Sequence, residues 1–103
     1  MWWKSRDPLD RRIKKLAVDM LAELAEAGWT VHSSEFSSRF FGNWWVTLRR
    51  GDQQITITRD RTEFSLDGSS EVGFSQADSL RSFASLAGVL GAIQDHGLLN
   101  RQP

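Results

Sequence analysis

The sequence predicts an α+β domain in which a helix, an antiparallel meander of three or four strands and a second helix follow one another. Three observations lead to this fold class. Apolar residues recur at helical spacing over residues 8–27 and again over 75–97, and between these segments apolar and polar residues alternate from Trp29 to Asp67. Because each helix and the sheet would have one apolar face, we expect two layers, with both helices on one face of the sheet.

The length and composition are those of a single globular domain. The chain has 103 residues, of which 40% are hydrophobic and 25% are charged. We expect residues 1–103 to form one domain, with residues 1–6 and 98–103 as loose tails. The sequence has no cysteine, which excludes a disulfide framework, thiolate metal sites and thiol catalysis. No apolar run approaches the roughly 20 residues that cross a membrane, so we expect a cytoplasmic protein without a membrane partner.

The first helix is predicted to run from Pro8 to about Ala27. Asp7 is a favourable N-cap, and proline is favourable at the first helical position. Gly28 stands where a left-handed residue commonly ends a helix, and Trp29 follows where a side chain often packs back on the last turn. The apolar stripe that would face the core comprises Leu9, Ile13, Leu16, Ala17, Met20 and Leu24.

Four segments are predicted to be strands, because apolar and polar residues alternate in them. They are 29–38, which is polar and typical of a sheet edge, then 43–50, 53–59 and 63–67. The tripeptide Arg-Gly-Asp at 50–52 fits a tight turn between the second and third strands. The meander would have one apolar face for the helices to cover.

The second helix is predicted to begin near Ser75, which forms a capping-box pattern with Asp78, and to end at Gly97. Two glycines, Gly88 and Gly91, lie inside it and cost up to about 1 kcal/mol each relative to alanine. They indicate close packing against another backbone, or fraying. The apolar stripe comprises Leu80, Phe83, Ala84, Ala87, Leu90 and Ile93.

Two adjacent tryptophans in the segment 43–50 should have different roles, since successive side chains of a strand point to opposite faces. Trp44 is expected in the core with Val46 and Leu48, and Trp45 on the outer face. Tryptophan and arginine dominate binding hot spots, so this face is predicted to bind a partner. The competing interpretation is that Trp45 only covers the sheet or is shielded by the loop 37–42. The predicted binding residues are Trp45, Thr47, Arg49, Thr56 and Thr58.

A basic cluster in the first helix suggests a second binding surface. Its members are Arg11, Arg12, Lys14 and Lys15. They lie near the positive end of the helix dipole, which is the reverse of the stabilising arrangement. An anionic partner, either an acidic protein surface or nucleic-acid phosphates, would explain them. The alternative is a solvated face with ion pairs such as Lys15 with Asp19.

Catalytic patterns are missing from the sequence. The two histidines, His32 and His96, have no metal-ligand spacing, and there is no glycine-rich phosphate loop or nucleophile elbow. We therefore predict no catalytic residues, no metal and no cofactor.

The arginines near the strand ends are expected to form local salt bridges with neighbouring acids. These arginines are Arg49, Arg50, Arg59 and Arg61, and the acids are Asp52, Asp60 and Glu63.

The segment "GNWWVTLRRGDQQITITRDRTEFSLD" resembles small uncharacterised bacterial α+β proteins in which one strand, a second strand with an Arg-Asp-Arg turn and an aromatic third strand follow one another. Arg59, Asp60 and Arg61 match that turn, while Thr62 departs from the glycine expected after it. Some proteins of this kind look like immunity or accessory factors that bind another protein. The resemblance therefore implies an interaction module.

These features predict a non-enzymatic interaction protein that binds another protein, one with an acidic surface. The alternative is a nucleic-acid-binding accessory protein that uses the basic first helix, with Trp2 and Trp3 stacking on bases. The formal net charge is zero, from 13 Lys plus Arg against 13 Asp plus Glu, whereas dedicated nucleic-acid binders tend to be basic. A homodimer is also compatible with the sequence.

Overall fold

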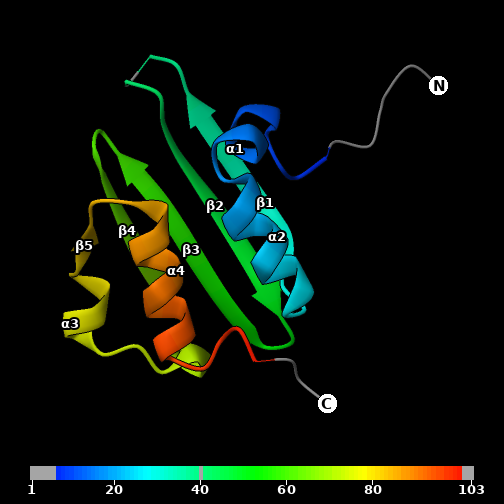
Figure 1. Ribbon diagram of the computed structural model, residues 1–103, viewed down its shortest axis with the longest axis vertical. Helices are drawn as coiled ribbons and strands as arrows, with labels where there is room; N and C mark the ends of the chain where they lie inside the picture. The colour runs from blue at the N-terminus through cyan, green and yellow to red at the C-terminus, as the bar shows by residue number, and fades with distance from the viewer. Residues whose placement is uncertain (1–6, 40, 101–103) are drawn as a thin grey trace.

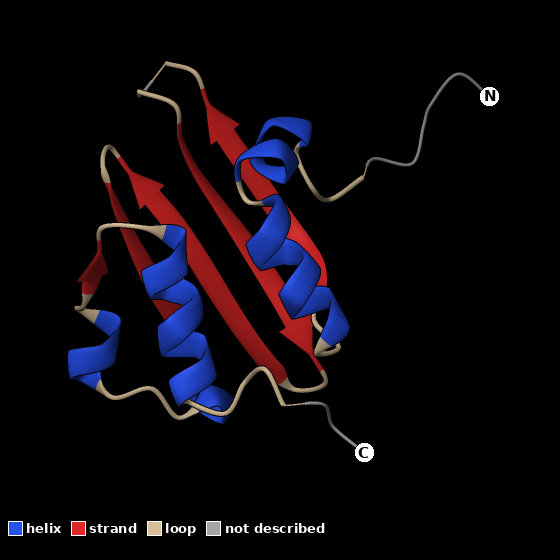
Figure 2. Ribbon diagram, in the orientation of Figure 1, coloured by secondary structure: helices blue, strands red, loops and turns tan. Residues whose placement is uncertain are grey.

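The computed structural model describes residues 7–39 and 41–100, which form a five-stranded antiparallel sheet with helices on one face (Figures 1 and 2). The strands follow chain order across the sheet. They are β1 (Thr30–Ser37), β2 (Asn43–Arg50), β3 (Gln53–Asp60), β4 (Glu63–Gly68) and β5 (Ser82–Phe83). The helices are α1 (Arg11–Leu16), α2 (Val18–Glu26), the 3-10 turn η1 (Ser70–Val72), α3 (Gln76–Ser79) and α4 (Leu86–Asp95). The predicted α+β class and antiparallel sheet are confirmed, but the count of three or four strands was too low.

The alternation of apolar and polar residues fixes which face of the sheet is buried. Val46 of β2 lies opposite Ile57 of β3, which lies opposite Leu66 of β4, and all three are at most 3% exposed. The strand β2 has the predicted bounds. In β1 the register shifts between Val31 and Ser33, so this edge strand contains a bulge of the kind that interrupts further strand pairing.

The first predicted helix is two helices that meet at Ala17, whose φ of −125° and ψ of 29° are not helical. The N-cap is Asp10, whose side chain accepts from the backbone N–H of Arg12, and not Asp7. The physical reason is a contact with β1: Ser34 Oγ donates to the Pro8 carbonyl at 2.6 Å and accepts from the Asp10 N–H at 2.8 Å. This contact occupies the backbone groups that an earlier helix start would use.

The apolar stripe of this region also differs from the prediction. Leu16 and Val18, on either side of the bend, are 56% and 55% exposed, so Leu16 does not belong to the core. The C-terminal end of α2 follows the prediction. Gly28 has φ 96°, and the N–H of Trp29 donates to the Leu24 carbonyl at 2.9 Å, as in a left-handed helix cap.

The second predicted helix is also divided, into α3, the short strand β5 and α4. Phe83 was expected on a helical stripe, yet it pairs with Phe64 of β4 and is 8% exposed. Burying this aromatic ring on the sheet edge outweighs continuing the helix, and Ser85 then caps α4 by accepting from the N–H of Gly88. Leu80, another expected stripe residue, is 78% exposed.

Further predictions for the second helical region concern its N-cap and its two internal glycines. The capping box between Ser75 and Asp78 is present. A Cβ at Gly88 would lie 3.4 Å from the ring of Phe83, an ordinary van der Waals distance to a side chain, and a Cβ at Gly91 would meet nothing within 4 Å. The expected close packing of these glycines against another backbone is therefore not found.

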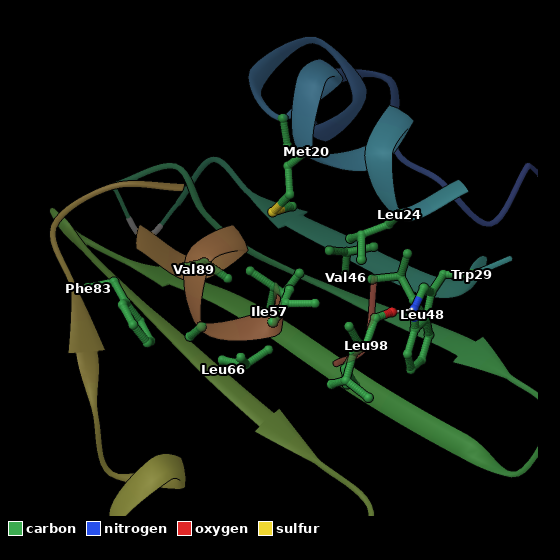
Figure 3. Packing of buried hydrophobic residues seen from close by; sticks show 14 of the residues in the cluster. Met20, Leu24, Trp29, Val46, Leu48, Ile57, Leu66, Phe83, Val89 and Leu98 are labelled. Carbon is green, nitrogen blue, oxygen red and sulfur yellow. Dashed lines mark hydrogen bonds between the residues drawn. The ribbon is translucent and has the colours of Figure 1, made fainter. Parts of the chain in front are cut away.

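The core lies between the sheet and the helices α2 and α4. Figure 3 shows Met20 and Leu24 of α2, and Val89 of α4, facing Val46 and Ile57 of the sheet. Each of these side chains is at most 3% exposed, and full burial of one such side chain contributes about 1.5–3 kcal/mol. Helices from both ends of the chain therefore cover one face of the sheet.

The chain after α4 is held against the domain through Asn100. Leu98 is 3% exposed, and its carbonyl accepts from the indole N–H of Trp29 at 2.7 Å. The prediction of a loose tail from residue 98 therefore differs from the structure for 98–100. Residues 101–103 and residues 1–6, with Trp2 and Trp3, lie outside the described residues.

Candidate functional site

The face of the sheet turned away from α1, α2 and α4, called the open face below, carries all five of the sheet residues predicted to bind a partner. In β2 these alternate with the buried Val46 and Leu48, and in β3 with the buried Ile55 and Ile57. The structure thus brings together on this face Trp45, Thr47, Arg49, Thr56 and Thr58. Their common placement follows from the pleat of the strands.

The polar groups in the middle of the open face bind one another. Thr47 lies opposite Thr56, and their hydroxyl oxygens are 2.9 Å apart. Arg49 donates from Nε to the Gln54 side-chain oxygen at 2.8 Å. Thr47 is only 7% exposed although it belongs to the open face. These cross-strand pairs make the centre of the face a rigid polar platform.

An open pocket of about 420 Å³ lies at the end of the open face where the β1–β2 loop and the β3–β4 turn meet. Trp45 lines it and lies between Glu35 of β1 and Thr58 of β3 in the register. The lining residues on the open face are Glu35, Ser37, Asn43, Trp45, Thr58 and Asp60. An aromatic floor with polar groups around it is the usual composition of a binding pocket.

Asn43 ties the two chain turns at this pocket together. Its side-chain nitrogen donates to Asp60 Oδ1 at 3.2 Å, and its side-chain oxygen accepts from the Arg61 N–H at 2.7 Å. Asn43, Asp60 and Glu35 were not predicted as site residues from the sequence. Alternation alone could have placed Asn43 and Asp60 on the open face, since each is two residues from a predicted member. Placing Glu35 on the open face requires the register of β1, which the bulge shifts by one residue.

An exposed aromatic ring lies in the β1–β2 loop, two residues before Asn43 of the pocket lining. Phe41 is 74% exposed and has φ 59°, a conformation that is rare for a bulky side chain. The guanidinium of Arg61, which also has a positive φ of 62°, lies 5.5 Å from the Phe41 ring centre. Arg59 donates to the Gly42 carbonyl at 3.2 Å. Non-glycine residues in this backbone region cluster at functional sites.

The basic cluster of the first helix is divided by the structure. Arg12 is paired with Asp10, with nitrogen–oxygen distances of 3.0 and 3.2 Å, and its guanidinium lies 4.2 Å above the ring of Phe36. The pKa of Asp10 is lowered, chiefly by the hydrogen bond from the Arg12 side chain. The other three members, Arg11, Lys14 and Lys15, are exposed and form no ion pair within the described chain.

The structure does not bring α1 and the open face together, because α1 lies on the helix side of the sheet (Figure 1). The ion pair between Lys15 and Asp19, which belonged to the alternative interpretation of a solvated face, is not formed either. A partner that docks flat on the open face therefore does not reach the basic residues of α1, and the two predicted surfaces must be considered separately.

The arginines at the strand ends make hydrogen bonds and cation–π contacts in place of the expected salt bridges. Arg50 is the clearest case. It is 8% exposed, and its Nη1 donates to the carbonyls of Ala27, Leu98 and Asn100 at 2.8–3.1 Å. Its Nε and Nη2 donate to the Gln53 side-chain oxygen. Burial lowers the pKa of Arg50. Through its hydrogen bonds, the Arg50 side chain holds the C-terminal segment to the sheet.

One histidine takes part in a polar cluster that resembles a catalytic arrangement only in composition. His96 Nδ1 donates to the Ala92 carbonyl at 2.9 Å, and its Nε2 lies 3.3 Å from Asp78 Oδ2. The Ser75 hydroxyl donates to that carboxylate at 2.9 Å and does not bind the imidazole. An imidazole that activates a hydroxyl must bind it. The cluster is the capping box of α3, with His96 joining it to α4.

Within residues 7–39 and 41–100, no three His, Asp or Glu side chains converge in a way that could hold a metal ion. In the same part of the chain, no helix has the length and apolar character needed to span a membrane.

Comparison with known proteins adds no family to this geometry. No protein-family model matches the chain, and neither the curated proteins nor the solved structures provide a match. The resemblance of residues 42–67 to small bacterial proteins therefore stays a prediction.

Proposed function

We propose that this protein is a non-enzymatic binding module that docks another protein on the open face of its sheet, with Trp45 as the anchor. One observation carries the proposal: Trp45 lines an open pocket of about 420 Å³ on the face that α1, α2 and α4 leave uncovered. Tryptophan residues near the centre of an interface provide a large share of the binding energy.

The surroundings of Trp45 fit this role. Thr47 and Thr56 bind each other and form a platform that needs no rearrangement on docking. Phe41 adds a ring that is 74% exposed in the β1–β2 loop, and Arg49 extends the face toward the β2–β3 turn. A rigid platform with aromatic anchors is typical of a pre-organised protein interface.

Binding is favoured over catalysis by what the candidate catalytic groups do. The carboxylate of Asp78 accepts from the Ser75 N–H at 2.8 Å, and the His96 ring is held between Ala92 and this carboxylate. These groups are used to join helices. We further infer a cytoplasmic location, since a chain without cysteine suits a reducing compartment, and an accessory or immunity-like role, which the resemblance of residues 42–67 implies.

The test is capture of a partner by the tagged protein from lysate of the native host, treated with nuclease, followed by calorimetry with the purified partner. We expect Trp45→Ala to weaken binding by about thirtyfold or more, the loss typical of a hot spot. The matched control is Val18→Ala, which removes an apolar side chain that is 55% exposed on the helix side. Equal affinities of the wild type and Trp45→Ala would overturn the proposal.

The same experiment separates two other functions. The exposed basic residues Arg11, Lys14 and Lys15 support nucleic-acid binding through α1 as the second candidate. Nucleic acid that is captured without nuclease, released by salt and lost in an Arg11→Glu/Lys14→Glu variant would favour that candidate. A sedimentation measurement that gives a dimer, converted to a monomer by Trp45→Ala, would make the partner a second copy of the chain.

A further inference from the structure

The charge on the open face differs in sign from the charge on α1. Alternation and register place four carboxylates on the open face, and the only arginine or lysine of its strands there is Arg49. The four are Glu35, Asp60, Glu63 and Asp67. All four are exposed. The net charge of the chain is zero, and a negatively charged open face and a positively charged α1 contribute opposite charges to it. The open face therefore complements a positively charged partner.

Two of the carboxylates flank the indole of Trp45. Glu35 lies directly opposite Trp45 in β1, and Asp60 lies two residues beyond Thr58, which is opposite Trp45 in β3. Directly opposed residues have Cβ atoms about 4.5–5.5 Å apart, and diagonal neighbours are about 7–8 Å apart. Both carboxylates line the same pocket as the indole. A cation above the ring would thus lie within reach of a negative charge on each side.

The arginines of the described chain do not occupy the position above the indole ring of Trp45. Within the described chain, guanidinium groups lie over four aromatic rings, and Trp45 is not among these. The rings are those of Phe36, Trp29, Phe41 and Phe83. Arg59, which also lines the pocket, donates to the Gly42 carbonyl. Trp45 and Glu35 therefore retain the capacity to bind a cation from outside.

We propose that this pocket receives an arginine or lysine side chain of the partner protein, with its cation on the indole of Trp45 and between Glu35 and Asp60. The inference rests on the proposed function and specifies the partner's chemistry: the docking segment is basic. The acidic partner expected from the sequence would suit α1 and not the open face. Cation–π contact and two ion pairs together make one side chain a selective anchor.

The test uses the full chain, labelled with 15N, and four nonapeptides of glycine and serine that differ at the central residue. That residue is arginine, lysine, citrulline or glutamate. At millimolar peptide, we expect the arginine and lysine peptides to shift the indole N–H resonance of Trp45. The citrulline peptide, which has the shape of arginine without its charge, and the glutamate peptide should leave it in place.

Matched charge variants localise the effect. Glu35→Gln/Asp60→Asn should weaken arginine-peptide binding by roughly fivefold. Asp52→Asn/Asp67→Asn removes the same charge outside the pocket lining, from the β2–β3 turn at the other end of the strands and from the β4 position opposite Thr56. At about 0.15 M salt its effect should be under about twofold because screening acts over about 8 Å. Amide spectra that retain the wild-type dispersion confirm folding of both variants.

Three outcomes would overturn the inference: no shift with any peptide, equal binding of the arginine and citrulline peptides, or equal weakening by the two double variants. Its failure is distinguishable from that of the proposed function. If a captured partner binds Trp45→Ala more weakly but binds Glu35→Gln/Asp60→Asn as it binds the wild type, the proposed function is supported and the cation-binding inference is refuted. A partner whose affinity is unchanged by Trp45→Ala refutes the proposed function, while the peptide titration still tests whether the pocket binds a cation.

Discussion

The two faces of this sheet are separated by a one-residue step along each strand, and the proposed function assigns stability to one face and binding to the other. On the helix side Val46 and Ile57 are fully buried. On the open face the neighbouring Thr47 and Thr56 bind each other through their hydroxyl groups. A substitution on one face should therefore change folding and leave binding, and the reverse should hold for the other face. Pairs of adjacent residues of the same type test this directly.

The tryptophan pair should give the largest difference. Trp44 is 2% exposed, its ring centre lies 6.1 Å from that of Phe64, and its indole N–H has no hydrogen-bond partner among the described residues. Trp44 therefore acts through packing. We expect Trp44→Ala to lower the free energy of unfolding by about 3–5 kcal/mol, and Trp45→Ala to lower it by about 1 kcal/mol or less.

Urea unfolding followed by far-ultraviolet circular dichroism measures both variants without depending on tryptophan fluorescence. Phe64→Leu is a control that trims the ring partner of Trp44 and should have an intermediate effect. If both tryptophan variants lost the same stability, the division between the faces would be wrong and Trp45 would be part of the fold.

The adjacent arginines should differ next. Arg50→Lys retains a positive charge but cannot donate to three carbonyls and to Gln53 at once, so some of these largely buried hydrogen bonds are lost. We expect the free energy of unfolding to fall by about 2 kcal/mol. Arg49→Lys, whose side chain is exposed and bonded only to Gln54, should change it by less than about 0.5 kcal/mol.

Thermal unfolding of these two variants under the same buffer conditions provides the comparison. Hydrogen exchange should also show faster exchange of the Leu98 N–H in Arg50→Lys, because the terminal segment loses its attachment. Unchanged exchange there, together with unchanged stability, would mean that Arg50 does not hold the C-terminal segment.

The central strands and their two faces could be predicted from the sequence because the information is local. In β2, Trp44, Val46 and Leu48 alternate with polar residues, and burial of one set determines the direction of the other. This is why the five predicted sheet residues share a face. The basic α1 residues were identified by charge alone, and charge does not report that Arg12 would pair with Asp10.

The features that were missed depend on contacts between distant parts of the chain. The bulge in β1 decides that Glu35 lies beside Trp45, and no periodicity reveals a bulge. Helical spacing around Phe83 was genuine, but a sheet edge that could bury this ring competed with the helix. Arg50 bonds to carbonyls that are 23–50 residues away, which composition cannot show. Local pattern thus predicts faces, while register and breaks require the tertiary structure.

The smallest predicted effect concerns the helix side alone and depends on pH. The pKa of His96 is raised above its ordinary value of 6.5, first by its hydrogen bond to the Ala92 carbonyl and then by Asp78, with Asp95 contributing less. Folding therefore favours the protonated imidazole, and its stabilisation is complete below about pH 6.5 and is lost as the pH rises through the folded pKa. The pKa of Asp78 is lowered from 3.8, mainly by hydrogen bonds from Ser75, so its contribution is lost in acid.

It follows that the stability difference between the wild type and His96→Gln should be largest between about pH 4 and 6.5 and should shrink on either side. Urea unfolding across this pH range measures it. His32→Gln is the matched control, because His32 is exposed in the β1 bulge and is not part of the cluster formed by His96, Asp78 and Ala92. Binding of an arginine peptide at Trp45 should not follow the same profile. A difference that grew above pH 7 would mean that neutral His96 is the stabilising form, and the link from α4 to the cap of α3 would then be a neutral hydrogen bond.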